Sequence, residues 1–382
     1  MSEWPMVKLK ELMRKTKSID PGKYPDEEFA LYSIPAYDNG IPEKIFGRDI
    51  GSSKILLKDS DVVLSKIVPH IRRTWVITDG EKQIGSSEWI VFNDDRFDPQ
   101  FIANYLKSDV FHYQLLTTVA GVGGSLNRAR PAAVAELKIP LPPLGEQKRI
   151  AEIFGKVSKA IQQVQGQLER TQELSLSVVD NFVKNELVDT QPLYELVEFR
   201  GGSTPSKKND DFWDDGNIRW FTSKDLKLNE LVDSIDHVTE SAIKNTALKP
   251  VSNIKAIAIS LRGMSLAHRV PMSVIPANSC VNQDLKALIP KAEMDVSVIF
   301  ALLKREEAYL LTKVTTSAHG TKKLDFPHVK NLQIPKLSSV QISKIKLQLE
   351  HINQLNHLLH RKLSLLQELQ KSLANRAFAG LL

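Results

Sequence analysis

Cysteine and long apolar runs are both scarce in this sequence of 382 residues. Cys280 is its only cysteine, so the chain can form neither an internal disulfide nor a cysteine-based zinc site. No window approaches the roughly 18 consecutive apolar residues that a membrane-spanning helix needs, and the opening stretch MSEWPMVKLKELMRK lacks the apolar region of a secretory signal. We therefore expect a cytoplasmic protein with no membrane partner.

Motifs that carry catalysis are also missing. Gly22-Lys23 and Gly155-Lys156 are not followed by Ser or Thr, which excludes a Walker loop at either place. The glycine-rich loop at 121–126 departs from the dinucleotide-binding pattern at its last position, and no Asp-Pro-Pro-Tyr-like motif for adenine methylation occurs. His357 and His360 fall on a predicted solvated helix face. We expect no catalytic residue and no metal site on this chain.

What the sequence does contain is an ordinary globular composition with a mild basic excess. Hydrophobic residues make up 42% and charged residues 25%, and the length predicts two or three domains. The formal net charge is +6 and the pI is near 9.1. This charge permits nucleic acid as a partner without demonstrating it.

The chain repeats itself at an offset of 195 residues. LKIPLPPLGEQKRIAEIF begins at Leu137, and LQIPKLSSVQISKIKLQLE begins at Leu332. After each, a row of mainly apolar residues steps by four and three alternately. The first row is Ile150, Phe154, Val157, Ile161, Val164, Leu168, Thr171, Ser175, Val178 and Phe182. The second row is Ile345, Leu349, Ile352, Asn356, Leu359, Leu363, Leu366, Gln370, Leu373 and Ala377.

These rows predict two long coiled-coil helices. Their period is 3.5 residues, sustained for about five heptads, and each helix of about 40 residues would be about 60 Å long. Ser338 and Gln341 predict a capping box at the second start, whereas Pro142 and Pro143 end the extended run before the first. Helices of this length are unusual in globular domains.

A mixed segment precedes each helix, which predicts an α+β fold in the order domain, helix, domain, helix. The predicted parts are residues 1–142, 143–189, 190–337 and 338–382. Predicted strands are Ile55–Leu57, Val62–Ile67, Thr74–Ile77, Trp89–Phe92, Ile218–Phe221, Ile254–Leu261 and Ala287–Ile289. Predicted short helices are Pro99–Leu106 and Val296–Leu303.

Connectivity predicts that the two long helices pair antiparallel. The second mixed domain starts at the end of the first helix and finishes at the start of the second, and the termini of a compact domain often lie close together. Parallel helices would force that domain to bridge about 60 Å. Antiparallel pairing relates the two similar domains by a pseudo-two-fold axis, which would suit two DNA half-sites in opposite orientation.

The helices also carry more apolar surface than one seam needs. Such surplus width predicts a docking face for another subunit, with self-association or covering by the adjacent domains as the alternative. The residues that we assign to this subunit interface are Ile153, Leu174, Leu355 and Leu369.

Polar loops in the mixed domains have the chemistry of DNA binding. Glycines allow close backbone approach, and Arg, Lys, Ser and Thr suit phosphates and base edges. Equivalent loops precede both hinges, although solvated loops without a ligand would look the same. The candidates in the first domain are Ser65, Lys66, His70, Arg72, Arg73, Gly124, Asn127, Arg128 and Arg130. The candidates in the second are Ser203, Thr204, Lys207, Lys208, Arg262, Arg269, His319, Thr321, Lys322 and Lys323.

Several stretches resemble the specificity subunit of type I restriction-modification systems, and together they cover nearly the whole chain. IPLPPLGEQKRIAEIF is similar to the start of the family's conserved region, and SLANRAFAGLL resembles its C-terminal end. GGSTPSKKNDDFWDDGNIRWFTSKDL resembles the start of its target-recognition domains, while LYSIPAYDNGIP with DVVLSKIVPHIRRTWVI is similar to another variety of them. The first domain lacks the opening found at 201–205, and the second hinge has one proline where the first has three.

The resemblance implies a non-catalytic DNA-binding subunit. Residues 1–142 and 190–337 would be target-recognition domains that each read half of an asymmetric bipartite site, and residues 143–189 and 338–382 would be the spacer helices. Two methyltransferase subunits would bind the helices and would recruit restriction subunits. Adenine methylation and restriction would belong to those partners, which would also hold S-adenosylmethionine, ATP and magnesium.

Other interpretations stay open. The chain could be the recognition subunit of a related type II methyltransferase or endonuclease system. It could also be a nuclease or methyltransferase of an unrecognised type, or a coiled-coil adaptor that does not bind DNA. Affinity for DNA that falls steeply with added salt would argue against the adaptor.

Overall fold

The computed structural model describes residues 4–78, 80–120, 127–183, 189–292, 294–317 and 319–381. The chain forms two compact units: unit 1 is residues 1–165 with 361–382, and unit 2 is residues 166–360. Each unit therefore contains part of both long helices. We call residues 4–143 the first head and residues 189–338 the second head. None of the helices in the described ranges combines the length and the apolar character that crossing a bilayer requires.

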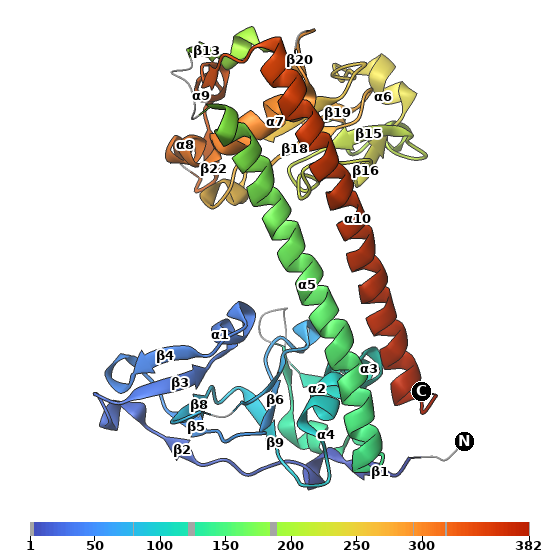
Figure 1. The fold of residues 1–382 in the computed structure, drawn as a ribbon. Coiled ribbons are helices and arrows are strands. Elements are labelled where there is room, and N and C mark those ends of the chain that lie inside the picture. The colour runs from blue at the N-terminus through green and yellow to red at the C-terminus, as the bar shows by residue number, and fades with distance from the viewer. Residues whose placement is uncertain are drawn as a thin grey trace. The chain divides into compact units, whose positions relative to one another are not determined.

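The first head is built from short strands and helices (Figure 1). The strands are β1 (Met6–Lys8), β2 (Ser18–Ile19), β3 (Glu28–Tyr32), β4 (Glu43–Phe46), β5 (Lys54–Leu56), β6 (Val62–Ser65), β7 (Thr74–Val76), β8 (Gln83–Gly85), β9 (Trp89–Phe92), β10 (Val119–Ala120), β11 (Arg128–Ala129) and β12 (Lys138–Pro140). The helices are α1 (Ile34–Asn39), α2 (Pro99–Lys107), α3 (Asp109–Leu116) and α4 (Pro131–Glu136), with the short 3-10 turns η1 (Leu9–Glu11) and η4 (Pro69–Ile71).

Two sheets organise this head. One has the strand order β2-β5-β8-β3-β4, and the other has the order β7-β6-β9. Every residue of β6 is buried, as the apolar run VVL followed by serine requires of a central strand. Helix α2 packs on β6 and β7. It begins after Asp98, whose carboxylate accepts the Phe101 N–H, and Phe101 and Tyr105 then point into the core.

The second head repeats this plan with its own elements. Its strands are β13 (Thr190–Pro192), β14 (Val197–Gly201), β15 (Ile218–Phe221), β16 (Asp236–Val238), β17 (Ala256–Ser260), β18 (Met272–Ile275), β19 (Cys280–Val281), β20 (Leu285–Pro290), β21 (Val314–Thr316), β22 (Lys322–Leu324) and β23 (Gln333–Pro335). Its helices are α6 (Glu240–Asn245), α7 (Val296–Arg305), α8 (Glu307–Thr312) and α9 (Phe326–Lys330), with the 3-10 turns η6 (Leu193–Glu195) and η8 (Met264–Ala267).

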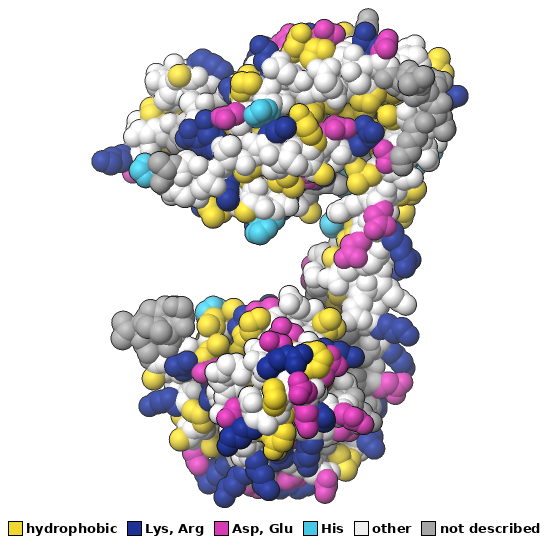
Figure 2. All heavy atoms as spheres, turned by 90° about the vertical axis from the view of Figure 1, so that its left-hand side faces the viewer, with side chains coloured by type: hydrophobic (Ala, Val, Ile, Leu, Met, Phe, Trp, Pro, Cys, Tyr) yellow, Lys and Arg dark blue, Asp and Glu magenta, His cyan; other side chains and the backbone are white. Residues whose placement is uncertain are grey.

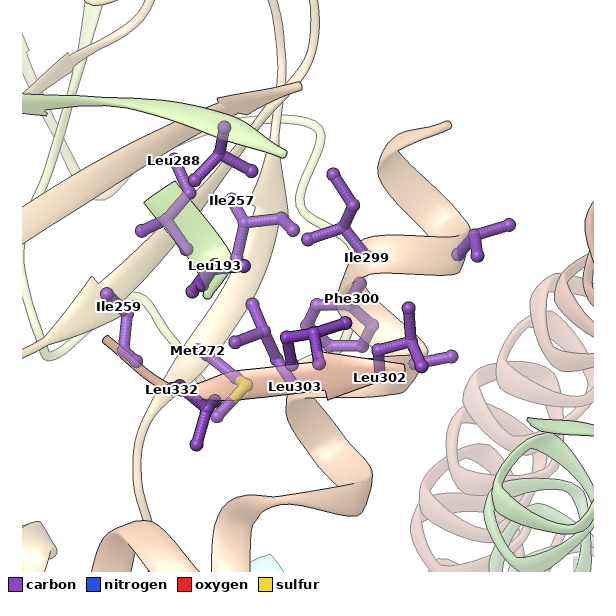
Figure 3. Packing of buried hydrophobic residues seen from close by; sticks show 14 of the residues in the cluster. Leu193, Ile257, Ile259, Met272, Leu288, Ile299, Phe300, Leu302, Leu303 and Leu332 are labelled. Atoms are coloured by element: carbon purple, nitrogen blue, oxygen red, sulfur yellow. The ribbon is translucent and has the colours of Figure 1, made fainter. Parts of the chain in front are cut away.

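A buried sheet and one helix form the core of the second head. The sheet order is β14-β20-β17-β18, and a smaller sheet has the order β16-β15-β19. All five residues of β17 are buried, and α7 packs on β17, β18 and β20. Figure 3 shows Ile257 and Leu288 of the sheet beside Ile299 and Phe300 of α7, in one hydrophobic cluster. The equivalent roles of β6 and β17, and of α2 and α7, confirm the internal repeat.

The strands and short helices predicted from the sequence are confirmed, with their ends moved by at most two residues. No strand was predicted at the start of either head, where the structure has β1 and β13. β1 pairs antiparallel with β12, and β13 pairs antiparallel with β23. The next residue continues each pairing, because Leu9 N–H donates to the Leu137 carbonyl and Leu193 N–H to the Leu332 carbonyl, both at 2.9 Å. Each head therefore begins and ends on one two-stranded ladder.

The long helices α5 (Leu144–Val183) and α10 (Ser339–Phe378) lie side by side in each unit (Figure 1). In unit 1, Phe154 of α5 and Phe378 of α10 share one core and their rings stack at 5.8 Å. In unit 2, Val179 of α5 packs with Ile345 of α10. The start of one helix thus meets the end of the other in both units, which confirms the antiparallel prediction.

The predicted seam is also confirmed. Every residue of the two predicted rows is buried or half-buried. Two polar pairs lie within or beside the seam: the Thr171 hydroxyl contacts the Asn356 side-chain amide in unit 2, and Gln370 donates to the Ser158 hydroxyl at 3.2 Å in unit 1. The capping box at the second helix is formed as predicted, because Ser338 N–H donates to Gln341 Oε1 at 2.8 Å and the Gln341 N–H donates back to the Ser338 hydroxyl.

Candidate nucleic-acid interface

In the first head, the turn after β6 is joined to the hairpin β10–β11. Ala129 N–H donates to the Lys66 carbonyl at 2.8 Å, and Val68 N–H donates to the Asn127 carbonyl at 3.1 Å. Ile67 and Arg128 form the bridge between them. Two loops that the sequence separates by about 60 positions therefore present their residues together.

The second head joins the turn after β17 to the hairpin β21–β22 in the same register. Leu324 N–H donates to the Leu261 carbonyl at 3.0 Å, and Gly263 N–H donates to the Lys322 carbonyl at 3.1 Å. Arg262 and Lys323 form the bridge. Each of these residues lies 195 positions after its equivalent in the first head. We call the turn and hairpin together the basic edge of each head.

A buried serine supports each turn from below. The Ser65 hydroxyl donates to the Ile67 carbonyl at 3.0 Å, and the Ser260 hydroxyl donates to the Arg262 carbonyl at 2.9 Å. Both side chains are buried. Ser65 was predicted to bind DNA, but its hydroxyl is already used inside the head, so it shapes the turn. Ser260 was missed, although the offset of 195 residues from Ser65 would have found it.

Basic residues at the first basic edge differ in solvent exposure and in the partners that their side chains already have. His70 and Arg130 are exposed, and Arg130 also donates to the Thr118 carbonyl at 3.3 Å. The Arg128 side chain is 61% exposed and pairs with Glu88 at 3.1 Å. Lys66 is half-buried. These positions suit contacts to phosphate or base edges.

Arg72 and Arg73 of the same turn are held by carboxylates. Arg73 is buried and donates two hydrogen bonds of 2.8 Å to Asp38, and this contact holds the pKa of the Asp38 carboxyl below its usual range. Arg72 donates to Asp109 at 2.6 Å. Both arginines were predicted to bind DNA, and the structure places both in ion pairs within the head. Gly124, another predicted residue, lies outside the described residues.

At the second basic edge the predicted side chains are mostly exposed. Arg262, Arg269, His319 and Thr321 are exposed, and Arg269 also donates to the Leu226 carbonyl at 3.0 Å. Lys322 and Lys323 are half-buried, and Lys323 pairs with Asp325. On the face shown in Figure 2, Lys and Arg lie among Asp and Glu without forming one continuous patch. Local clusters of this kind agree with the modest net charge.

The loop after β14 carries the predicted residues Ser203, Thr204, Lys207 and Lys208, and it belongs to neither the turn nor the hairpin of the second basic edge. Trp220 Nε1 donates to the Ser203 carbonyl at 3.0 Å, and Lys207 Nζ lies over the Trp213 ring at 5.5 Å. A Cβ on Gly202 would meet the Val281 carbonyl oxygen, so only glycine fits there. The tryptophans fix this loop, and the hydroxyl of Thr204 contacts Gln283. Thr204 and Lys208 remain exposed.

The predicted subunit-interface residues on the helices are accessible. Leu174 of α5 is 49% exposed, and Leu355 and Leu369 of α10 are 45% and 46% exposed. Ile153 is half-buried. Further leucines of α10, Leu347, Leu358 and Leu365, are more than half exposed. By heptad position Leu355 and Leu369 flank the seam, Leu358 and Leu365 lie farther out on the same flank, and Leu347 lies opposite the seam.

Chemistry for catalysis is sparse in the part of the chain that the structure describes. Within those residues no cluster of His, Cys, Asp and Glu has the geometry to hold a metal ion. Cys280 is buried, and burial raises the pKa of its thiol to about 12, so it is not a nucleophile at neutral pH.

Comparison with known proteins identifies relatives of this arrangement. The family model for the type I restriction modification DNA specificity domain matches residues 1–171 and 185–365. The specificity subunit of the type I restriction enzyme EcoR124I/EcoR124II from Escherichia coli is 26% identical over 210 residues, which are 53% of this chain and 52% of that protein. The chain thus aligns with about half the length of this curated relative.

Two solved structures share the fold. One belongs to work on complex assembly and conformational transition of the type I R-M system; it has a TM-score of 0.59 and 18% identity, and the match covers 100% of this chain and 99% of that one. The other is the S subunit of a type I restriction-modification system from M. genitalium, with a TM-score of 0.57, 14% identity, and coverage of 98% and 96%.

Proposed function

The chain belongs to the type I restriction modification DNA specificity domain family, and from this premise we propose that each head reads one half of an asymmetric bipartite site in duplex DNA. The observation that carries the proposal is the repeated basic edge. In both heads the same backbone hydrogen bonds join a turn to a hairpin and bring basic residues from both together. The side chains of the two edges differ, so the two half-sites would differ as well.

Chemistry would belong to partner subunits. Methyltransferase subunits would bind the exposed leucines of α10, one on unit 1 beside Leu365 and Leu369 and one on unit 2 beside Leu355 and Leu358. Restriction subunits would join through them. S-adenosylmethionine, ATP and magnesium would bind these partners, which would methylate adenine and cut DNA.

The decisive experiment is methylation of genomic DNA. The chain is co-expressed with its methyltransferase subunit, and methylated adenines are mapped by methylation-sensitive sequencing. We expect one asymmetric split site, with one half that changes when the exposed cations of the first basic edge are replaced (His70→Ala with Arg128→Ala). A half-site that stays unchanged after this double replacement would contradict reading by the first head.

A second arm separates the catalytic alternative. The purified chain alone is incubated with DNA, magnesium and S-adenosylmethionine, and transfer of the methyl group and strand cutting are measured. We expect neither until the methyltransferase subunit is added. Activity of the isolated chain would favour an enzyme, and absence of salt-dependent DNA binding would favour a coiled-coil adaptor.

A further inference from the structure

The turn of the first basic edge has an unusual backbone. Val68 and Arg72, which flank η4, have φ values of 47° and 56°, so both are left-handed. This conformation is unfavourable for residues other than glycine, and most of all for a β-branched side chain. The surrounding structure must therefore hold the turn in place.

A carboxylate supplies that restraint in the first head. Asp109, the first residue of α3, accepts from Arg72 Nη1 at 2.6 Å, and the same nitrogen donates to the Lys107 carbonyl at 3.3 Å. Asp109 also lies 3.7 Å from Lys371 of α10, which belongs to the same unit. The contact with Arg72 holds the pKa of the Asp109 carboxyl below its usual range. The carboxylate is thus charged at neutral pH and fixed from two sides.

A carboxylate at the same place in the fold restrains the second turn by a different contact. Glu307, the first residue of α8, accepts the backbone N–H of Val270 at 2.8 Å. Val270 follows Arg269, at the end of the turn that carries Arg262 and His268. Lys304 pairs with the other oxygen of Glu307. In this head the residue equivalent to Val68 is Gly263, whose φ of 135° and ψ of 159° form a conformation that essentially only glycine adopts.

We propose that Asp109 and Glu307 are positioning residues for DNA reading: each fixes the turn of its own basic edge to the helix that follows the core helix. The inference rests on the proposed function. Arg72, being occupied by Asp109, holds the turn and does not contact DNA. The bases are read by side chains whose places these two carboxylates set.

The experiment selects binding sites with the full-length chain. The probe is a pool of duplex DNA with a fully randomised central segment, from which bound molecules are recovered and sequenced. Asp109→Ala should lower the base preference of the half-site read by the first head by about tenfold, since one misread base pair typically has an effect of this size. Glu307→Ala should do the same at the other half-site. Each variant should leave the opposite half-site unchanged.

Conservative variants separate positioning from general stability. Glu307→Gln keeps an oxygen that accepts the Val270 N–H, so it should retain the wild-type preference, and Asp109→Glu should recover part of what Asp109→Ala loses. Glu136→Gln is the matched control, because Glu136 pairs with Lys8 and Lys10 on the same head. It should change neither half-site. Amide hydrogen exchange in β6 and β17 checks that each variant is folded.

The salt dependence of binding tests the role of Arg72. Removal of a residue that contacts phosphate lowers the slope of log K against log salt by about 1. Arg128→Gln should lower the slope, whereas Arg72→Gln should leave the slope unchanged and lose base preference as Asp109→Ala does.

The outcomes are distinguishable. If the wild-type chain enriches no sequence, the proposed function fails and this inference falls with it. If the wild type is specific but Asp109→Ala is equally specific, the proposed function stands and the inference is wrong. Equal weakening of both half-sites by one variant, or a lower salt slope in Arg72→Gln, would also overturn it.

Discussion

The two heads reach one backbone arrangement by different side chains. The turn and hairpin of each basic edge share their hydrogen bonds at an offset of 195 residues, yet Val68 stands where Gly263 serves in the second head. Backbone amides and carbonyls must form hydrogen bonds whatever the sequence, so the fold sets which of them pair. Side chains are free to diverge as long as some group restrains the turn.

The same contrast holds where the heads meet the long helices. Unit 1 uses aromatic packing, with Phe378 against Phe101, Tyr105 and Phe154. Unit 2 uses aliphatic packing, with Ile345 among valine and leucine side chains. Aromatic rings bury more surface area per residue, so the loss of one ring should lower stability more than the loss of one aliphatic side chain.

The largest effect should come from Phe378→Ala. Removal of this buried ring leaves a cavity among three aromatic side chains and should lower the stability of unit 1 by about 3 to 5 kcal/mol. Amide hydrogen exchange in α2 would measure it, with the exposed neighbour Leu381→Ala as control. Equal loss of protection in α7 would show that the two units do not unfold separately.

Substitution of the glycine in the second turn, Gly263, should have the next largest effect on stability. No atom lies within 4 Å of a Cβ built on Gly263, so Gly263→Val would be opposed by backbone conformation alone. The expected loss is about 2 to 3 kcal/mol in the second head, measured by exchange in β17. Gly166→Ala is the matched control, because Gly166 lies in α5 and alanine there should stabilise the helix. A neutral Gly263→Val would mean that the turn tolerates other conformations.

Acid should weaken the first head through Asp38. Its pKa is lowered by Arg73, so this carboxylate contributes stability above the unfolded-state pKa near 4 and loses it as the pH falls through the lower folded-state value. At pH 7, Asp38→Asn should lower the stability of this head by about 1 kcal/mol, and the difference from wild type should vanish at low pH. Urea unfolding as a function of pH measures this, with the exposed Asp26→Asn as control. A difference that persists at pH 2 would refute it.

The smallest effect should be a gain. Val68→Gly removes the left-handed strain but adds freedom to the unfolded chain, so a net stabilisation of about 0.5 to 1 kcal/mol is expected. Val68→Ala keeps the strain and should show no such gain. Hydrogen exchange of the Val68–Asn127 pair reports on it directly. A loss of stability in Val68→Gly would show that the Val68 side chain, not the backbone, holds the turn.

Sequence periodicity predicted the elements with strong local signals. The heptad rows predicted both long helices, and the apolar runs predicted β6 and β17, because these patterns depend on burial of each segment along its own length. Connectivity, not periodicity, predicted that the helices run antiparallel. The pairing of β1 with β12 could not be predicted in this way, since MVK has no period and its partner lies about 130 positions away.

Prediction of the site was limited in the same way: local sequence signals identified residues, but contacts between distant segments could not be predicted. Residue type identified the basic loops, and the repeat placed them before both hinges. Residue type could not show that Arg72 and Arg73 are held by Asp109 and Asp38, because those carboxylates come from other parts of the chain. The two aspartates carry no motif, and only folding brings them to the turn.

The position of Phe378 determines which unit completes its core last during synthesis. The core of unit 1 contains Ala377 and Phe378 from the last turn of α10, whereas unit 2 is made entirely of residues 166–360. A ribosome delivers the chain from its N-terminus, so the last residue of unit 2 is made before Ala377 and Phe378. The unit that starts the sequence is therefore the last to complete its core, and translation must reach Phe378 before the first head gains its full support.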